Sequence, residues 1–556
     1  MSTEGSTMTG GMAIVEALIA NGIDRVFGLP GAQLYPFFDA LKLRSDKVRT
    51  YGARHEQTCG YMAFGHARST GRPGVFAVVP GPGVLNAAAA LCTASGCNAP
   101  VLCITGDVPS AFLGRGRGHL HELADQLATL RTIVKWAARI ERPADAPAVI
   151  NEAFRQMLSG RPGPVAVEMC WDTMASSGHV VPLPAADIPP APAPAPDEVE
   201  AAANLLVAAK APMIFTGSGA QHACTEIRAL AEALDAPVTA FRGGRGVMPE
   251  DHDLGISSYA AFRLWPETDA AIAIGTRCEL PYMRWTGMMT MIDRPAPPPF
   301  LIRIDIDASE MRRLVPHAPI VADAAEGARL LREAVERLRG KKSAAVSKKA
   351  RQRIVAAKCK ARAIYEKVQP QIGYLDAIRA TLPRDGIITT ELSQIGFTSY
   401  FGYTVLEPRT YITEGFQGTL GYGFPTALGV KAAHPDRPVV CLTGDGGFLF
   451  GACELSIAVQ EGIGLITVLF NNSAYGNVLR DQRERFANRT IGAVLENPDF
   501  LLFARSFGVR AHRVGSPAEL ASVLGKELKT KEPVLVEVTV PQGSETSPWE
   551  FILPKR

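Results

Sequence analysis

The sequence lacks the features that mark membrane-spanning, secreted or nucleic-acid-binding proteins. No run approaches the roughly 20 consecutive apolar residues of a membrane-spanning helix, and the opening MSTEGSTMTGG has no basic region followed by an apolar core. Lys plus Arg number 58 and Asp plus Glu number 55, so no excess positive charge favours nucleic acid or an anionic membrane. We therefore expect neither among the partners.

The ten cysteines show neither the paired spacing of a zinc site nor the pattern of a disulfide framework. They are scattered along the chain, without a CxxC pair, and a protein of this size can build its core without disulfides. This distribution predicts free thiols in a reducing, cytoplasmic environment.

The length of 556 residues favours several domains over one. Hydrophobic residues make up 47% and charged residues 20%, as in ordinary globular proteins. Two stretches are typical of linkers: the proline-rich VPLPAADIPPAPAPAPDEVE (Val181 to Glu200) and the basic GKKSAAVSKKARQR (Gly340 to Arg353). They predict three domains, at residues 1–180, 197–340 and 360–556.

Short β-branched runs alternate with longer helical patterns throughout the chain. Near-continuous apolar strands separated by helices predict the α/β class, here as three doubly wound parallel-sheet domains. Ligands of such sheets bind at the carboxyl ends of the strands, where this sequence places glycine-rich turns. The runs are VFAVVPGPG and PVLCITGD in the first part, APMIFTGSGA, AAIAIGTR and FLIRIDID in the second, and RPVVCLTGDGG and LITVLFNN in the third.

One stretch, GDGGFLFGACELSIAVQEGIGLITVLFNN, places an aspartate and an asparagine pair after neighbouring strands. Asp445 and Asn472 stand one βαβ unit apart, so both would lie at the same edge of a parallel sheet. A carboxylate, an amide oxygen and a backbone carbonyl suit Mg²⁺, which takes its other ligands from phosphate and water. The glycines at 444, 446 and 447 let backbone N–H groups approach a phosphate. GDG alone would indicate only a tight turn; with the asparagines, it indicates a metal and diphosphate site.

This stretch resembles the thiamine-diphosphate binding motif, in which GDG and NN are separated by a little under thirty residues. The resemblance implies that Asp445 and the Asn472 side chain bind Mg²⁺, with the backbone carbonyl of Ala474 as third ligand. The resemblance also implies that the cofactor is contacted by Gly444, Gly446, Gly447, Tyr475 and Gly476.

A second stretch, YGARHEQTCGYMAFGHARSTGRPGVFAVVPGPGVLN, resembles the N-terminal signature of the acetolactate-synthase-like branch of these enzymes. The similarity covers all three domains, in the order pyrimidine-binding, central and diphosphate-binding. The family's glutamate falls on Glu56. Its carboxyl would bond N1′ of the aminopyrimidine and favour the imino tautomer, which removes the C2 proton of the thiazolium. In the resembling enzymes this glutamate serves cofactor held by another subunit, which implies a homodimer or homotetramer.

Further matches are EGFQGTLGYGFPTALG and ELSQIG. By resemblance, Leu420 supports the bent cofactor, and the backbone carbonyl of Gly418 accepts from its 4′-amino group. Gln394 becomes a candidate contact of the diphosphate.

The sequence departs from the acetolactate synthases where their second substrate binds. Asp481 stands where they carry a tryptophan and Asn477 where they carry a methionine, which argues against the standard acetolactate pocket. His121 replaces a glutamine, and histidine as a residue type suits a proton donor or acceptor near neutral pH. The alternative is that His121 merely packs against the next helix. Gln33, in the PGAQ turn, is a further pocket candidate.

The central part and the tail are less informative. GSGA after a strand is only a weak dinucleotide-like turn, although Arg277 matches a family nucleotide contact. Relatives hold FAD, ADP or nothing in this domain, so the sequence leaves open whether this domain binds FAD. The tail GSETSPWEFILPKR (Gly543 to Arg556) predicts docking of its apolar WEFIL stretch on its own subunit, with a lid over the site as the alternative.

The resemblance identifies a thiamine-diphosphate- and Mg²⁺-dependent transferase or lyase. It implies cleavage or formation of a carbon–carbon bond at a small-molecule 2-oxo acid or 2-hydroxy ketone. Acetolactate-synthase-like carboligation stands beside simple 2-oxo acid decarboxylation and a benzaldehyde-lyase-like reaction. A catalytically silent cofactor-binding subunit is a further alternative, disfavoured because Glu56 is retained.

Overall fold

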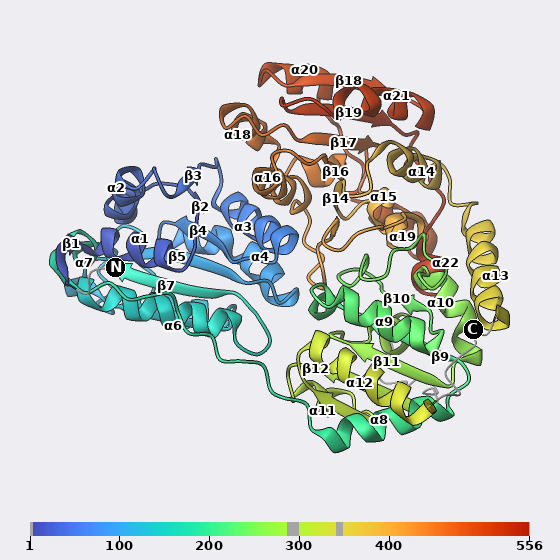
Figure 1. Cartoon of the computed structure of the whole chain (residues 1–556). Helices are drawn as coiled ribbons and strands as arrows, with labels where there is room; N and C mark the ends of the chain where they lie inside the picture. The colour runs from blue at the N-terminus through green and yellow to red at the C-terminus, as the bar shows by residue number, and fades with distance from the viewer. Residues whose placement is uncertain (1–3, 286–299, 341–347, 555–556) are drawn as a thin grey trace.

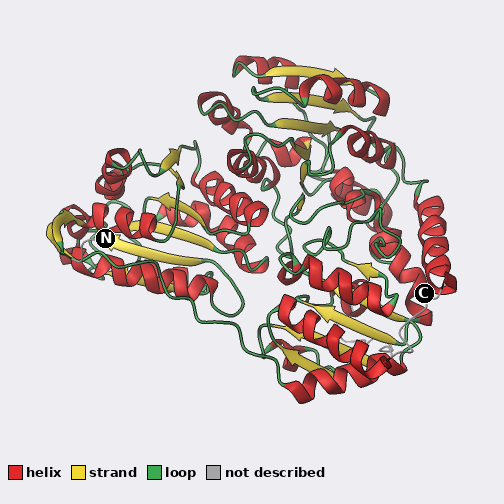
Figure 2. Ribbon diagram, in the orientation of Figure 1, coloured by secondary structure: helices red, strands yellow, loops and turns green. Residues whose placement is uncertain are grey.

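The computed structural model describes residues 4–285, 300–340 and 348–554, which form three α/β domains along one chain (Figure 1). In each domain, helices pack around a parallel sheet (Figure 2). A separate antiparallel pair joins β1 (Ser6–Thr9) to β8 (Ser177–Val180). The predicted class, α/β with three parallel-sheet domains, is confirmed.

The first sheet has the strand order β3-β2-β4-β5-β7-β6. α1 (Gly10–Ala20), α2 (Tyr35–Leu43) and α6 (Ala146–Leu158) supply the core on one face. α3 (Glu56–Thr70) and α4 (Pro82–Gly96) supply it on the other. Covering both faces explains why β4 and β5 are buried along their whole length. The strands are β2 (Arg25–Gly28), β3 (Arg49–Tyr51), β4 (Gly74–Val78), β5 (Val101–Asp107), β6 (Trp136–Ile140) and β7 (Val165–Cys170).

The third sheet has the order β15-β14-β16-β17-β19-β18, so its connections repeat those of the first. Its α16 (Gly423–Ala433) packs directly on α3, and the two domains share one apolar core. A Cβ on Gly65 would lie 2.3 Å from the Thr426 oxygen, so glycine permits this close approach. The strands are β14 (Ile387–Thr390), β15 (Tyr411–Ile412), β16 (Val439–Gly444), β17 (Ile466–Asn471), β18 (Arg510–Val514) and β19 (Val534–Thr539).

The central sheet has the order β10-β9-β11-β12-β13. α8 (Pro196–Ala208), α9 (Cys224–Leu234) and α12 (Ala324–Arg339) contribute to its core. The proline-rich linker runs without helix or strand until α8 begins. Within the second expected linker, residues 341–347 lie outside the described residues and α13 begins at Lys348. The strands are β9 (Pro212–Thr216), β10 (Val238–Thr239), β11 (Ala270–Ile274), β12 (Phe300–Asp305) and β13 (Ala318–Val321).

The strand orders create a switch point in each sheet, where successive connections leave in opposite directions. These points lie between β2 and β4, between β9 and β11, and between β14 and β16. A crevice opens at such a point beyond the carboxyl ends of the strands. The turns that carry Gln33, Gly217 and Asp445 each follow a strand at one of these points, so each lies at the crevice of its own sheet.

The other helices surround this frame, and none in the described part of the chain is long and apolar enough to cross a membrane. They are α5 (Gln126–Arg131), α7 (Trp171–Ala175), α10 (Ser258–Leu264), α11 (Glu310–Arg313), α13 (Lys348–Tyr365), α14 (Gln371–Thr381), α15 (Gln394–Gly402), α17 (Asp445–Phe448), α18 (Leu455–Gln460), α19 (Gly476–Arg485), α20 (Phe500–Ser506), α21 (Pro517–Glu527) and α22 (Trp549–Ile552).

Candidate active site

The glycine turn after β16 lies at the switch point of the third sheet. β16 ends at Gly444, and α17 begins with Asp445, Gly446 and Gly447. Asp445 is 2% exposed, and its Oδ2 accepts a hydrogen bond of 2.7 Å from Nδ2 of Asn497. Burial raises the pKa of Asp445 above its ordinary range, because a buried carboxylate is poorly solvated. A cation beside it would reverse this effect.

The asparagine pair stands at the end of β17 (Ile466–Asn471) and reaches the same place. Oδ1 of Asn472 accepts a hydrogen bond of 3.1 Å from the backbone nitrogen of Ala474. The Ala474 backbone also donates a hydrogen bond to the Asp445 carboxyl. This hydrogen bond lowers the pKa of Asp445 and partly offsets the larger effect of burial. The structure therefore groups the three residues for which the sequence predicts metal binding. Their oxygens fit Mg²⁺, whereas the described residues contain no cluster of three His, Cys, Asp or Glu side chains that could hold a metal.

Glycines allow the surrounding loops to approach this point closely. A Cβ on Gly446 would lie 2.4 Å from Cε1 of Tyr475. A Cβ on Gly476 would lie 2.9 Å from Nδ2 of Asn472 and 3.5 Å from Nε2 of Gln394. The cofactor-binding candidates on three separate loops are therefore in mutual contact. α17 and α19 begin in these loops, and the N-terminal end of a helix favours a bound phosphate group.

The loop that carries Gly418 and Leu420 is held by a buried glutamate. The carboxylate of Glu391 accepts hydrogen bonds from the backbone nitrogens of Gly421 (3.3 Å) and Gly423 (2.8 Å). Burial raises the pKa of Glu391 to about 7. Gly418 has φ +60, a conformation that favours glycine, and it is exposed, while Leu420 is half-buried. Both residues are therefore accessible beside the metal site.

Sequence reasoning missed two side chains that orient the metal donors. Nδ2 of Asn497 also donates to Oδ1 of Asn471 at 3.0 Å. Both of its partners are acceptors, which decides the orientation of the amide. Among the residues that the structure describes, Oδ1 of Asn497 is buried without a hydrogen-bond partner, as fits an acceptor for cation-bound water. Oε2 of Glu545 accepts from Nδ2 of Asn472 at 2.5 Å. Neither residue belongs to a recognisable motif.

Glu545 belongs to the C-terminal tail, which docks on its own subunit. The indole nitrogen of Trp549 donates to Oδ1 of Asn477, and Nε2 of Gln371 donates to the Thr546 carbonyl at 2.8 Å. The docking predicted for this tail is thus present, and it brings Glu545 to the metal loop. Residues 555–556 of the stretch lie outside the described residues.

Glu56 is the first residue of α3, at the edge of the first domain. Its Oε2 accepts a hydrogen bond of 3.0 Å from Nδ2 of Asn86. A Cβ on Gly83 would lie 3.6 Å from Oε1 of Glu56, so the Gly-Pro-Gly turn lies against this carboxyl. Glu56 is half-buried in the single chain and hence accessible.

Gln33 and His121, predicted for the pocket, contact each other. Nδ1 of His121 lies 2.8 Å from Oε1 of Gln33, and Nε2 of Gln33 donates to the carbonyl of Leu120 at 2.8 Å. Gln33 is fully buried, and His121 has φ +65. Such a φ is uncommon outside glycine and concentrates at functional sites. Within the described residues, no hydrogen bond of Glu56, Gln33 or His121 reaches Asp445 or Asn472.

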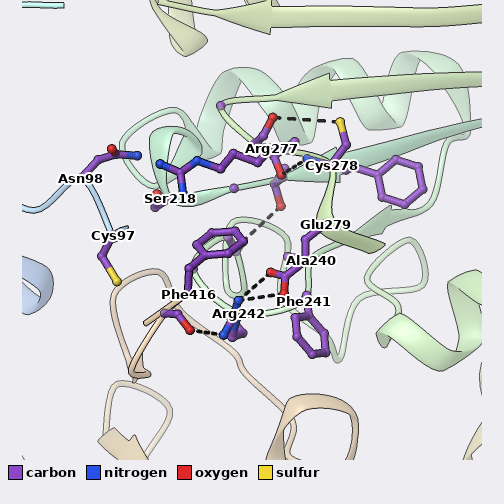
Figure 3. Close-up of a pocket in the computed structure, with 18 of the residues that line it drawn as sticks. Cys97, Asn98, Ser218, Ala240, Phe241, Arg242, Arg277, Cys278, Glu279 and Phe416 are labelled. Carbon is purple, nitrogen blue, oxygen red and sulfur yellow. Dashed lines mark hydrogen bonds and ion pairs between the residues drawn. The ribbon is translucent and has the colours of Figure 1, made fainter. Parts of the chain in front are cut away.

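The central domain contains a cavity at its own switch point (Figure 3). Phe416, from the loop that precedes Gly418, lies between two arginines of the central domain. The guanidinium carbons of Arg242 and Arg277 are each 4.8 Å from its ring centroid, a cation–π distance. Arg242 also pairs with Glu279 at 2.8 Å. This cavity is therefore polar, cationic and linked to the cofactor loop.

Comparison with known families gives three matches in the order of the three sheets. Residues 8–129 match the N-terminal TPP binding domain of thiamine pyrophosphate enzymes, residues 199–331 the central domain and residues 393–538 the C-terminal TPP binding domain.

Comparison with known proteins agrees over nearly the whole chain. A probable 2-ketoarginine decarboxylase of Pseudomonas aeruginosa is 34% identical, covering 90% of this chain and 89% of that protein. A probable acetolactate synthase large subunit of Methanocaldococcus jannaschii is 32% identical, over 96% and 92%. The acetolactate synthase isozyme 1 large subunit of Escherichia coli is 29% identical, over 99% and 98%. The chain belongs to the thiamine pyrophosphate enzymes, in the acetolactate-synthase-like family.

Proposed function

We propose that the protein is an enzyme that cleaves or forms a carbon–carbon bond at a 2-oxo acid or 2-hydroxy ketone, with thiamine diphosphate and Mg²⁺. The observation that carries this proposal is the meeting of Asp445, Asn472 and Ala474 beside the glycine turn at the switch point. These donors would hold Mg²⁺, and the N–H groups around Gly446 and Gly476 would hold the diphosphate.

When bound, thiamine diphosphate would supply a carbon nucleophile for the substrate carbonyl and an electron sink for the broken bond. Glu56 holds the proton that is shared with N1′ of the aminopyrimidine. The backbone carbonyl of Gly418 would accept from the 4′-amino group, and Leu420 would support the bent cofactor. Gln394 contacts the diphosphate. Each of these residues lies on a turn or helix end that the fold holds in place.

His121 is proposed to move a proton at the substrate. The Gln33 amide donates through its nitrogen to Leu120, so its oxygen faces the ring and requires a proton on Nδ1 of His121. The neutral ring then presents Nε2 as an acceptor, which suits a base that removes a proton from a hydroxyl group.

A specific observation favours decarboxylation as the second candidate. Arg480 donates to Oδ1 of Asn477 at 2.5 Å and to Oε1 of Gln394 at 3.3 Å, and the side chain of Asp481 is 38% exposed. Asn477 and Asp481 stand where the acetolactate synthases carry apolar side chains around their second substrate. A solvated acceptor site favours a proton over a second carbonyl as the group that reacts after the first bond is broken. One relative is a probable 2-ketoarginine decarboxylase.

We also propose a homodimer or homotetramer in the cytoplasm. Glu56 is accessible and makes no contact with the metal donors of its own chain, as expected if a neighbouring subunit completes the site. The exposed Leu85, Leu449 and Phe450 flank the two halves of the site and could be covered by that neighbour. All ten cysteines are free, which fits a reducing location.

FAD is proposed as a second bound group, in the central cavity. Gly217 and Gly275 line this cavity where the backbones of two strand ends pack closely together, and Arg277 lies half-buried beside them. The absorbance spectrum of the purified protein tests this: a band near 450 nm supports FAD, and its absence after incubation with FAD removes the proposal.

Turnover of pyruvate and of larger 2-oxo acids with thiamine diphosphate and Mg²⁺ tests the main proposal, with Glu56→Gln as control. Acetolactate lost in the control supports a carboligase, whereas CO₂ with an aldehyde supports a decarboxylase. Failure to bind thiamine diphosphate would overturn the proposal.

A further inference from the structure

Glu454 is a buried carboxylate that the active-site description leaves unused. It lies directly before α18, in the segment that follows the metal-binding turn, and it is fully buried. Its hydrogen-bond donors among the described residues are backbone N–H groups and one hydroxyl, and the charge of the Arg54 side chain acts on it only as a weaker influence. Burying an unpaired carboxylate is costly unless hydrogen bonds replace its lost water.

Backbone N–H groups of the first domain provide these hydrogen bonds. The nitrogen of Arg54 lies 3.0 Å from each oxygen of Glu454, and the nitrogen of His55 lies 3.0 Å from Oε1. The Thr58 hydroxyl is a further partner. The contacts join segments 400 residues apart in the sequence. Hydrogen bonds of this kind to a charged acceptor are about twice as strong as neutral ones.

The N–H groups held by Glu454 are those immediately before Glu56. α3 begins at Glu56, and His55 is its capping residue, with Nδ1 accepting from the backbone of Gln57 at 3.1 Å. A negative charge at this end is favoured by the helix dipole. Because two consecutive peptide groups are bound to one rigid side chain, the backbone that leads into Glu56 has little freedom to move.

We propose that Glu454 is a positioning residue for Glu56. By binding the two preceding peptide groups, it sets the position from which the Glu56 carboxyl reaches the aminopyrimidine. This inference rests on the proposed role of Glu56 and adds a residue from the diphosphate-binding domain to it. A contact that only joined the two domains would not require a carboxylate at the start of this particular helix.

The test compares Glu454→Ala and Glu454→Gln with the wild type as full-length protein loaded with thiamine diphosphate and Mg²⁺. The readout is the exchange rate of the cofactor's C2 proton in D₂O, measured by acid quench and NMR. We expect Glu454→Ala to slow exchange about 10- to 100-fold, since a displacement near 1 Å has effects of this size. Glu454→Gln keeps one accepting oxygen and should recover part of the rate. Affinity for thiamine diphosphate should stay within about threefold of the wild type, because no metal or diphosphate donor is changed.

Glu461→Gln is the matched control, because Glu461 also contacts the first domain, through Arg49 at 3.6 Å, but away from α3. Normal exchange in Glu454→Ala, or equal slowing in Glu461→Gln, would overturn the proposal. If Glu454→Ala does not fold, Glu454→Gln decides: slowed exchange at an unchanged unfolding midpoint supports the inference, and wild-type exchange overturns it. Normal exchange in Glu56→Gln, or no cofactor binding by the wild type, would instead show that the proposed function is wrong.

Discussion

The ring nitrogen Nδ1 of His121 lies 2.8 Å from Oε1 of Gln33, at a backbone φ of +65 for the histidine. Two residues from separate loops of the first domain therefore hold an imidazole in one orientation and one tautomer. A histidine that only packed against the next helix would need neither the buried glutamine nor the unusual backbone.

His121→Ala should lower kcat about 100-fold, the usual size of an acid–base contribution, and leave the affinity for thiamine diphosphate unchanged. Gln33→Ala should lower kcat less, about tenfold, because the ring stays but loses its orientation. Steady-state kinetics and cofactor titration measure both. The exposed His179 provides the control His179→Ala. If His121→Ala keeps the wild-type kcat, this histidine has only a packing role.

Asn497→Ala should weaken Mg²⁺ binding about 10- to 100-fold, as is typical for groups that orient a metal ligand. Its amide holds Oδ2 of Asp445 at 2.7 Å, leaving the other carboxylate oxygen for the metal. Titration of Mg²⁺ at fixed thiamine diphosphate, followed by protein fluorescence, gives the affinity. Asn204→Ala, on the exposed surface of α8, should show no change. An unchanged affinity in Asn497→Ala would mean that Asp445 keeps its position without this contact.

Gly476→Ala should reduce affinity for thiamine diphosphate about tenfold or more, because overpacking displaces neighbouring groups. The new Cβ would lie 2.9 Å from Nδ2 of Asn472. Isothermal titration with the cofactor measures the loss. Gly525→Ala in α21 is the matched control, since nothing lies within 4 Å of its Cβ position. Equal affinities in the two variants would argue against a tight loop arrangement around Asn472.

Protonation of His66 should reduce the stability of the folded protein as the pH is lowered from about 6.5 towards 4. The residue is 3% exposed, and burial lowers the pKa of His66 to about 4. The unfolded chain takes up this proton near pH 6.5, so acid favours unfolding, by about 3 kcal/mol at most for this group. Burial of Glu391 acts in the opposite direction, because its raised pKa favours the folded state as the pH falls below about 7.

The comparison of His66→Gln with the wild type isolates the histidine from these other groups. Lowering the pH from 7.5 to 5 should change the thermal unfolding midpoint less unfavourably in the variant than in the wild type, although the variant is less stable overall. His179→Ala should retain the wild-type difference. If His66→Gln loses as much stability between the two pH values as the wild type, His66 is not the group that titrates.

The local sequence of this protein determines its class and the core of its candidate site. Apolar strands that end in glycine turns specify parallel sheets, since such strands must be covered on both faces. The turn around Asp445 and the loop around Asn472 each follow a strand directly. Their shared sheet edge is therefore predictable from the spacing, without knowledge of the remaining chain.

Only the tertiary structure decided which other side chains support these residues. Asn497 reaches Asp445 from 52 residues away, Glu545 reaches Asn472 from 73, and Glu454 reaches Arg54 from 400. The pair Gln33 and His121 could be proposed for one pocket, but not their mutual orientation. Periodicity and spacing indicate which residues are neighbours along one helix or strand. The donors to a buried carboxylate are set instead by the packing of separate segments, which brings unpaired N–H groups beside it.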